Sequence, residues 1–229
     1  NVNDTGIDAL HPDLENRAVA ADPLFLQDPD GHGTHVAGTI AASGVSSTLV
    51  TNTIPGSVQG ANFRGMAPAA NLFVLPINRV TGPLESDTVL QTTAAATNYL
   101  VLNRTNALIS NNSWGRIGEN EYSISAASYD AAVRDALPEM PGPQGVAYVF
   151  AAGNDGFGSN DGLGGEPDSI SAPATGKNVI TVGAVEHNRQ IQNEVETMLP
   201  NGMIETNRPF LPETDSDDEV ASFSSRGNV

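Results

Sequence analysis

The chain has 229 residues, with 27 acidic against 10 basic side chains, a net charge of −17 and no cysteine. A charge this negative disfavours a nucleic-acid partner, since a phosphate backbone attracts lysine and arginine. The lack of cysteine excludes disulfides, thiolate metal sites and a cysteine nucleophile, and no apolar run approaches the ~20 residues of a membrane span. The length suits one α/β unit with a sizeable core.

Apolar runs alternate along the chain with helical patterns. Residues 32–42 predict a helix rich in small residues, and residues 86–100 predict a weaker one. An apolar face at helical spacing predicts a third helix over residues 129–137, which Pro138 ends. This alternation favours a parallel sheet with helices on both faces. The strands are predicted at residues 71–75, 107–109, 146–150 and 179–182.

Two stretches depart from this pattern. Residues 43–60 are rich in serine, threonine and glycine and are expected to form a surface loop. Residues 186–219 hold nine carboxylates, two arginines and three prolines without periodicity. We expect them to be an exposed insertion or a mobile loop.

Polar residues that suit catalysis stand where glycines turn the chain. His32 follows Gly31 and has the chemistry of a general base, which needs a buried carboxylate at Nδ1 to fix its tautomer. Asp4, at a junction between a strand and a turn, is a candidate for that carboxylate. Asn154 offers an amide donor of the kind that stabilises a tetrahedral oxyanion.

Each of these residues also has a simpler explanation. Asp4, before Thr-Gly, is typical of a turn, and Asn154 is typical of a loop. His32 and His35 lack the third ligand of a zinc site, and His35 is expected to be a core or supporting histidine. Residues 28–31, Asp-Pro-Asp-Gly, are similar to the start of a calcium loop, but the glycine stands two places early.

The motifs taken together decide between these interpretations. Asp-Thr-Gly-Ile-Asp (4–8), His-Gly-Thr-His-Val-Ala-Gly-Thr (32–39), Asn-Asn-Ser-Trp-Gly (111–115) and Ala-Ala-Gly-Asn-Asp-Gly (151–156), in this order, resemble the subtilisin-like serine proteases. The resemblance covers essentially the whole chain. It implies a three-layer αβα fold with a mainly parallel sheet, here incomplete at both ends. It also implies a serine endopeptidase with an Asp-His-Ser triad.

The resemblance gives the candidate residues their roles. Asp4 matches the triad aspartate, His32 the general base and Asn154 the side-chain donor to the oxyanion. Two further segments match the walls of the substrate site: Ser113, Trp114 and Gly115 on one side, Ala152 and Gly153 on the other.

The resemblance also bears on cofactors and partners. It implies an extended polypeptide substrate, secretion, a pro-peptide in the full-length protein and no cofactor required for the chemistry. Asp13 matches a calcium ligand of some members, but residues 43–60 lack the loop that completes that site. A structural calcium ion therefore stays unassigned, and the metal ligands are unknown.

The nucleophile is the main departure from the family pattern. The chain contains no Gly-Thr-Ser-Met-Ala-type segment, so the attacking serine is expected beyond residue 229. These 229 residues alone are then expected to be inactive, because a base without a nucleophile cannot form an acyl-enzyme. The alternative is a non-catalytic pseudoprotease or peptide-binding module. The joint presence of Asp4, His32 and Asn154 disfavours it.

Overall fold

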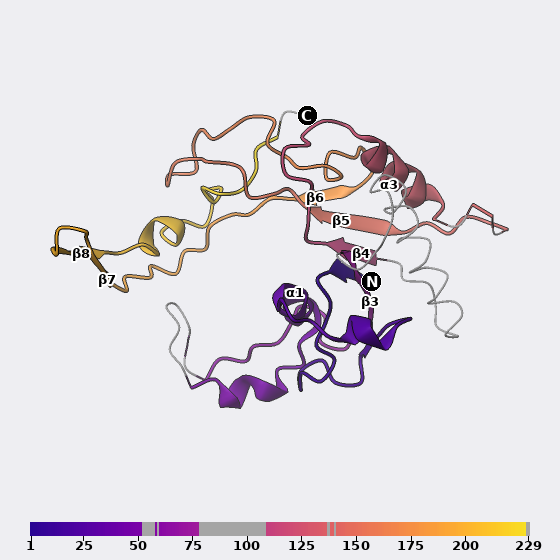
Figure 1. Cartoon of the computed structure of the whole chain (residues 1–229), viewed down its shortest axis with the longest axis horizontal. Helices are drawn as coiled ribbons and strands as arrows, with labels where there is room; N and C mark the ends of the chain where they lie inside the picture. Colours follow the sequence, from indigo (N-terminus) through magenta and orange to yellow (C-terminus); the bar gives the residue numbers. More distant parts are fainter. Residues whose placement is uncertain (52–57, 59, 78–108, 137, 140, 228–229) are drawn as a thin grey trace.

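The computed structural model describes residues 1–51, 58, 60–77, 109–136, 138–139 and 141–227. Within them, six strands form a sheet in the order β2-β3-β1-β4-β5-β6, and all five described pairs are parallel (Figure 1). The strands are β1 (Val2–Asp4), β2 (Ala18–Val19), β3 (Leu72–Pro76), β4 (Ile109–Asn112), β5 (Ala147–Ala151) and β6 (Ile180–Val182). The helices are α1 (His32–Ala41) and α3 (Ile124–Arg134), with short 3₁₀ turns η1 (Pro23–Leu26), η2 (Val45–Leu49) and η4 (Leu211–Glu213).

The two described α-helices pack on opposite faces of this sheet. Val2, Leu72 and Val74 form one buried cluster with Ala37 and Ala41 of α1. The opposite face carries a second cluster, because side chains alternate along each strand. There, Tyr129 of α3 stacks edge-on against Tyr148 and Phe150 of β5, with ring centroids 4.9 and 4.8 Å apart. The predicted α/β architecture, with a mainly parallel sheet and helices, is confirmed.

The observed bounds of the strands and helices can be compared with those predicted from the sequence. Each of the four predicted strands overlaps an observed one. The third predicted helix begins earlier than expected, where the Ser123 side chain accepts a hydrogen bond from the Ala126 backbone, and it ends at Arg134. β1, which has three residues, was anticipated only as the strand that ends at Asp4, and β2 was not predicted, because its two residues carry no readable pattern. The helix predicted at residues 86–100 lies outside the described residues.

Residues 186–219 contain regular structure that their composition did not predict. β7 (Val195–Met198) and β8 (Ile204–Asn207) pair antiparallel as a hairpin that projects away from the main sheet (Figure 1). Asn201 and Gly202 lie in its turn, where Met203 N–H donates to Asn201 Oδ1 at 3.0 Å. Asn-Gly is a strong hairpin signal. The expectation of an exposed segment holds for both strands, whose residues are all exposed.

Candidate active site

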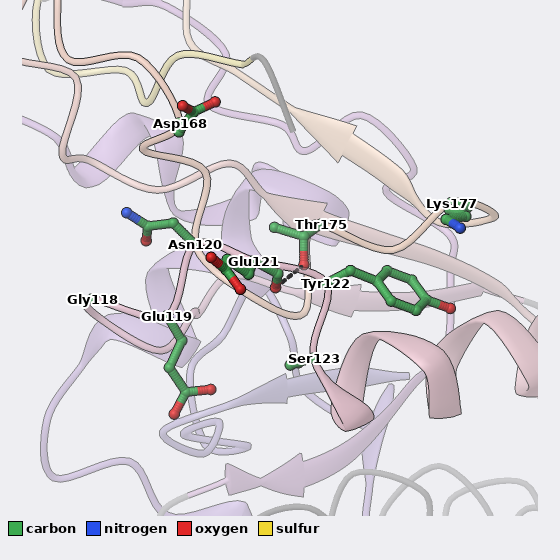
Figure 2. A pocket seen from close by; sticks show the side chains of 9 residues that line it. All are labelled: Gly118, Glu119, Asn120, Glu121, Tyr122, Ser123, Asp168, Thr175 and Lys177. Atoms are coloured by element: carbon green, nitrogen blue, oxygen red, sulfur yellow. Dashed lines mark hydrogen bonds between the residues drawn. The ribbon is translucent and has the colours of Figure 1, made fainter.

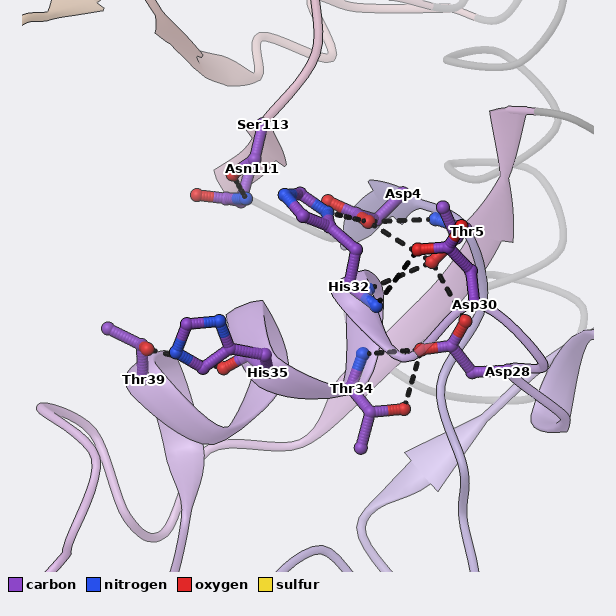
Figure 3. Close-up of polar contacts among 11 residues, drawn as sticks. Asp4, Thr5, Asp28, Asp30, His32, Thr34, His35, Thr39, Asn111 and Ser113 are labelled. Atoms are coloured by element: carbon purple, nitrogen blue, oxygen red, sulfur yellow. Dashed lines mark hydrogen bonds and ion pairs between the residues drawn. The ribbon is translucent and has the colours of Figure 1, made fainter. Parts of the chain in front are cut away.

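The site begins with a contact between β1 and the first residue of α1. Nδ1 of His32 lies 2.6 Å from Oδ1 of Asp4, in hydrogen-bonding and ion-pairing range (Figure 3). The Asp4 side chain is 2% exposed, whereas that of His32 is 51% exposed. The structure therefore brings together a buried carboxylate and an accessible imidazole from two residues 28 positions apart.

A glycine next to the histidine makes this approach possible. A Cβ atom on Gly33 would lie 2.1 Å from the Gly6 carbonyl oxygen and 3.1 Å from Oδ1 of Asp4. Because any larger residue would collide with the turn after β1, only glycine lets the start of α1 come this close. Gly33 N–H donates to Oγ1 of Thr5 at 2.9 Å, which fixes the helix end against that turn.

Asp28 holds the same region together through hydrogen bonds, and its role was not predicted from the sequence. Its Oδ2 accepts from the backbone N–H and the hydroxyl of Thr34, at 2.8 and 2.7 Å, and its Oδ1 accepts from Thr5 Oγ1 at 2.8 Å (Figure 3). Burial raises the pKa of Asp28, but hydrogen bonds from Thr34 and Thr5 outweigh it and hold the pKa below its usual value. Asp28 thus stays ionised and ties the residue after β1 to the first turn of α1.

The geometry defines what the His32 ring can do. A carboxylate only accepts hydrogen bonds, so its contact with Nδ1 assigns the proton of neutral His32 to that nitrogen. Nε2 then carries a lone pair on the half-exposed side of the ring. An imidazole held in this tautomer can take a proton from an attacking group, and the buried carboxylate stabilises the resulting imidazolium.

The remaining candidate residues gather at the same edge of the sheet. Asn3 of β1 pairs with Asn112 of β4, and Asn112 pairs with Phe150 of β5, so the carboxyl ends of three strands lie in one row. Asp4 and Ser113 directly follow the first two of these residues. In open parallel sheets, this edge is where ligands bind, next to the point where the strand order reverses. Here β1 is that point, with β3 on one side and β4 on the other.

Asn154 lies three residues beyond the end of β5, and its side chain is exposed. Its loop is held from the other end of the chain. The Ser225 backbone N–H donates to the Gly153 carbonyl at 3.0 Å, and Asp155 N–H donates to Ser225 Oγ at 3.1 Å. Asn154 is therefore presented by a braced loop at the same edge of the sheet.

The two predicted walls of the substrate site meet at Ser171. A Cβ on Gly115 would lie 2.7 Å from Ser171 Cβ, and one on Gly153 would lie 3.1 Å from Ser171 Oγ. The Ala152 carbonyl accepts from Ser171 N–H at 3.0 Å. Trp114 packs edge-on against Phe150, with centroids 5.7 Å apart. Residues 113–115 and 152–153 are thus brought together.

Two other residues were singled out from the sequence. His35 is exposed on α1, so it is not a core histidine, and a supporting role for it stays a prediction. Asp13 is buried, and its Oδ1 accepts from Ser43 Oγ at 2.9 Å and from Ser46 N–H at 3.1 Å. Burial raises the pKa of Asp13, but these hydrogen bonds lower it below its usual value. The protein itself therefore satisfies this oxygen.

A cavity of about 870 Å³ lies in the region that follows residues 113–115 (Figure 2). Its polar wall includes Glu119, Glu121 and Asp168, together with Lys177, whose Nζ lies 4.8 Å above the Tyr122 ring. Neither Asp4 nor His32 lines it. The cavity is thus not formed by the contact between Asp4 and His32.

Comparison with known proteins identifies the family. The sequence matches the Peptidase S8 model, described as the subtilase family, over residues 1–229. The chain belongs to the subtilase family. It is 30% identical to the serine protease AprX of Bacillus subtilis (strain 168), over 99% of this chain and 42% of that protein. It is 28% identical to an intracellular serine protease of Paenibacillus polymyxa, over 87% of this chain and 55% of that protein.

Solved structures give the same subtilase fold. The S41 psychrophilic protease matches all of this chain and 58% of its own, with a TM-score of 0.54 and 26% identity. Sphericase also matches all of this chain, with a TM-score of 0.56 and 24% identity. The subtilase chain described here spans about half the length of the curated relatives it matches.

Two of the curated subtilases are named as intracellular proteases, so membership of the family does not imply secretion. Within the described residues, none of the helices has the length and apolar character needed to cross a bilayer.

Proposed function

We propose that this chain supplies most of the catalytic domain of a serine endopeptidase, in which Asp4 orients His32 and His32 acts as the general base. The observation that carries the proposal is the 2.6 Å contact between Asp4 Oδ1 and His32 Nδ1, with the carboxylate buried and the ring half exposed. A carboxylate that served only to form a turn would not need an imidazole at this distance.

The attacking serine comes, in this proposal, from sequence beyond residue 229. His32 Nε2 takes the proton from its hydroxyl, and the serine oxygen attacks the substrate carbonyl. Asn154 donates from its side-chain amide to the oxyanion that forms. Membership of the subtilase family and the partial coverage of the relatives support this division of the triad.

The substrate is an extended polypeptide that lies beside residues 113–115. The peptide adds to this segment as a further strand, so that its backbone rather than its sequence supplies most of the contacts. Ala152 and Gly153 form the facing wall, which the contacts with Ser171 hold in place. A pro-peptide and secretion stay predictions of the family resemblance.

The test is Asp4→Asn in the full-length protein. We expect kcat for a peptide substrate to fall about 10⁴-fold with the fold intact, because an amide can stabilise the wrong imidazole tautomer. Asp8→Asn is the matched control, since Asp8 is an exposed carboxylate four residues away, and it should keep the parent kcat.

Circular dichroism and kcat are measured for both variants. Near-parental turnover by Asp4→Asn would remove the carboxylate from the mechanism. A full-length protein that binds peptides but shows no burst with an activated ester would point instead to a pseudoprotease.

A further inference from the structure

The β7–β8 hairpin follows the strand that ends next to the active-site loops. β6 is parallel to β5, so both strands end at the same edge of the sheet, and the chain continues from the end of β6 into the hairpin (Figure 1). In the strand order β1-β4-β5-β6, Asp4 ends the first strand, residues 113–115 follow the second and Asn154 follows the third. The hairpin follows the fourth, so it comes next in this row after the two walls of the proposed substrate site.

Backbone hydrogen bonds hold the base of the hairpin at that edge. On the way out, the N–H of the buried Glu186 donates to the Glu219 carbonyl at 3.0 Å. On the way back, the Phe223 carbonyl accepts from the N–H of Gly156, in the loop of Asn154, also at 3.0 Å. The hairpin therefore projects from a base that is tied to the active-site edge.

One face of the hairpin exposes apolar side chains. Met198 lies opposite Ile204 across the two strands, and Glu196 lies opposite Thr206. Because side chains alternate along a strand and directly opposed residues share a face, these four side chains lie on the same face. Met198 is 75% exposed and Ile204 is 60% exposed. Apolar side chains that are grouped on an exposed element, with polar neighbours, are typical of an interaction site.

The hairpin also has outer strand edges. Within the described residues, β7 pairs with β8 alone, and the two strands form a sheet of their own. The N–H and C=O groups along the outer edge of a sheet can pair with another extended chain. Glu196 and Met198 both belong to β7, so a chain that adds to the outer edge of β7 would lie directly beside them.

Charge indicates which kind of chain would bind there. Residues 186–219 hold nine carboxylates against two arginines, in a protein of net charge −17. Arg208 pairs with Glu194 at 2.9 Å, whereas Glu196 joins no ion pair within the part of the chain that the structure describes. A second copy of the hairpin would bring like charges together, which destabilises strand pairing. A basic chain would instead be attracted.

We propose that the β7–β8 hairpin is a docking surface for polypeptide substrates that carry a basic and an apolar residue two positions apart. The inference rests on the proposed function and adds to it a contact remote from the scissile bond. The substrate segment adds as a strand to the outer edge of β7. Its apolar side chain then packs on Met198, whose flexible thioether accepts different shapes, and its lysine or arginine pairs with Glu196.

Kinetics on extended substrates tests the docking surface. A short peptide that the full-length protein cleaves is extended, on each side in turn, by a tail of about 12 residues, which can span about 40 Å. The tail repeats either Lys-Thr-Leu-Thr or Gly-Ser. The readout is kcat/KM with the first tail divided by kcat/KM with the second. On one side, we expect this ratio to be about 10 in the parent and to come from KM, because docking is equal in the ground and transition states.

Three variants locate the effect. Glu196→Lys reverses the charge on the exposed face, and Met198→Ser removes its apolar side chain. Each should lower the ratio to below about 2. Glu139→Lys is the matched control, since Glu139 is an exposed carboxylate between α3 and β5, before β5 begins, and this variant should keep the parent ratio. A parent ratio of one, or an equal fall in Glu196→Lys and Glu139→Lys, would overturn the proposal.

Binding is also measured without hydrolysis, in the full-length protein with His32→Ala as the common background. Fluorescence anisotropy of the labelled Lys-Thr-Leu-Thr tail gives its Kd, which should rise more than about fivefold in Glu196→Lys and should also rise with added salt. Sedimentation of the same proteins measures self-association. A dimer of the parent that Met198→Ser dissociates would show that the surface binds a second copy, and the proposal fails.

The two measurements keep the docking surface and the proposed function apart. A full-length protein that binds the tail through Glu196 but cleaves no peptide would support the docking surface and contradict the proposed function. A protein that cleaves the short peptide and gains nothing from either position of the tail would contradict the docking surface alone.

Discussion

Asp4 uses one carboxylate oxygen, Oδ1, for His32 and for the Thr5 backbone N–H, which donates to it at 2.8 Å, and keeps the other, Oδ2, buried without a hydrogen-bond partner among the described residues. A buried acceptor left unsatisfied costs roughly 1–3 kcal/mol, and such groups in native structures call for an explanation. Under the proposed function, an oxygen that accepts from no other donor leaves charge available to stabilise the imidazolium that forms when His32 takes a proton.

Asn154 carries the residue-scale prediction. In the full-length protein, Asn154→Ala should lower kcat by roughly 10²–10³ with little change in KM, because the amide meets the substrate oxygen mainly in the transition state. Steady-state kinetics on a peptide ester measures both constants. Asn160→Ala, an exposed asparagine in the same loop region, is the control. An effect confined to KM would make Asn154 a substrate-binding residue instead.

The individual site residues differ in how far the sequence could predict them. Asp4 and His32 were predictable, because the glycines around them belong to motifs whose spacing is specific. Asp28 was not, because Asp-Pro-Asp-Gly is typical of many turns and only the folded chain places it beside Thr5 and Thr34. Glu186 looked like one more acidic residue in a charged segment. Its burial depends on the backbone pairing with Glu219, which no local pattern predicts.

At the scale of elements, the position of α1 decides whether the site exists. Its first turn lies against the turn after β1, and its buried alanines, Ala37 and Ala41, keep the helix close to the sheet. β3 was predicted because a buried parallel strand is a continuous apolar run, and all five of its residues are buried. β6 has the same kind of run, although its Ile180 and Val182 are exposed. β1 was anticipated only by its end at Asp4, because two of its three residues, Asn3 and Asp4, are polar although both are buried. Asn3 is satisfied by Asn112, whose side-chain oxygen accepts from it at 2.8 Å.

Gly33→Ala tests the close approach of α1. The added Cβ would collide with the Gly6 carbonyl, so the helix must shift. We expect a loss of about 1–3 kcal/mol in unfolding free energy and a fall in kcat of roughly 10²-fold, since a displacement of about 1 Å suffices for that. Urea denaturation and kinetics on the full-length protein give both values.

Gly38→Ala is the control in the same helix. A Cβ there would meet nothing within 4 Å, so this variant should be as stable as the parent or slightly more stable. Equal behaviour of the two variants would mean that the start of α1 adapts, and that the glycine beside His32 has another role.

At the scale of the whole molecule, a net charge of −17 makes the state of the carboxylates a general determinant of stability. Asp13, Asp28 and Asp130 all have a pKa below the usual value, because hydrogen bonds outweigh the opposing effect of burial. For Asp130 those bonds come from the backbone of Asn178 and Lys177 and from the hydroxyl of Tyr122.

Acid should therefore unfold the protein. These groups bind fewer protons when folded than when unfolded, so their contribution is complete above about pH 4 and is lost as the pH falls through their folded pKa values. Urea midpoints from pH 6 to pH 3, measured in EDTA, should fall steeply below pH 4. Asp130→Asn should have a shallower fall than the parent. Parallel curves would mean that Asp130 contributes nothing to the acid transition.

The strand order affects how the chain folds. β1 lies between β3 and β4. Its Val2 pairs with Val74 on one side and with Asn111 on the other. Pairings between residues far apart in sequence slow folding, because the entropy cost of closing a long loop comes before the stabilising contacts form. The β7–β8 hairpin, whose partners are neighbours in sequence, is free of that delay. During synthesis, the chain must leave the ribosome as far as residue 112 before residues 2–4 can form both of their strand pairings.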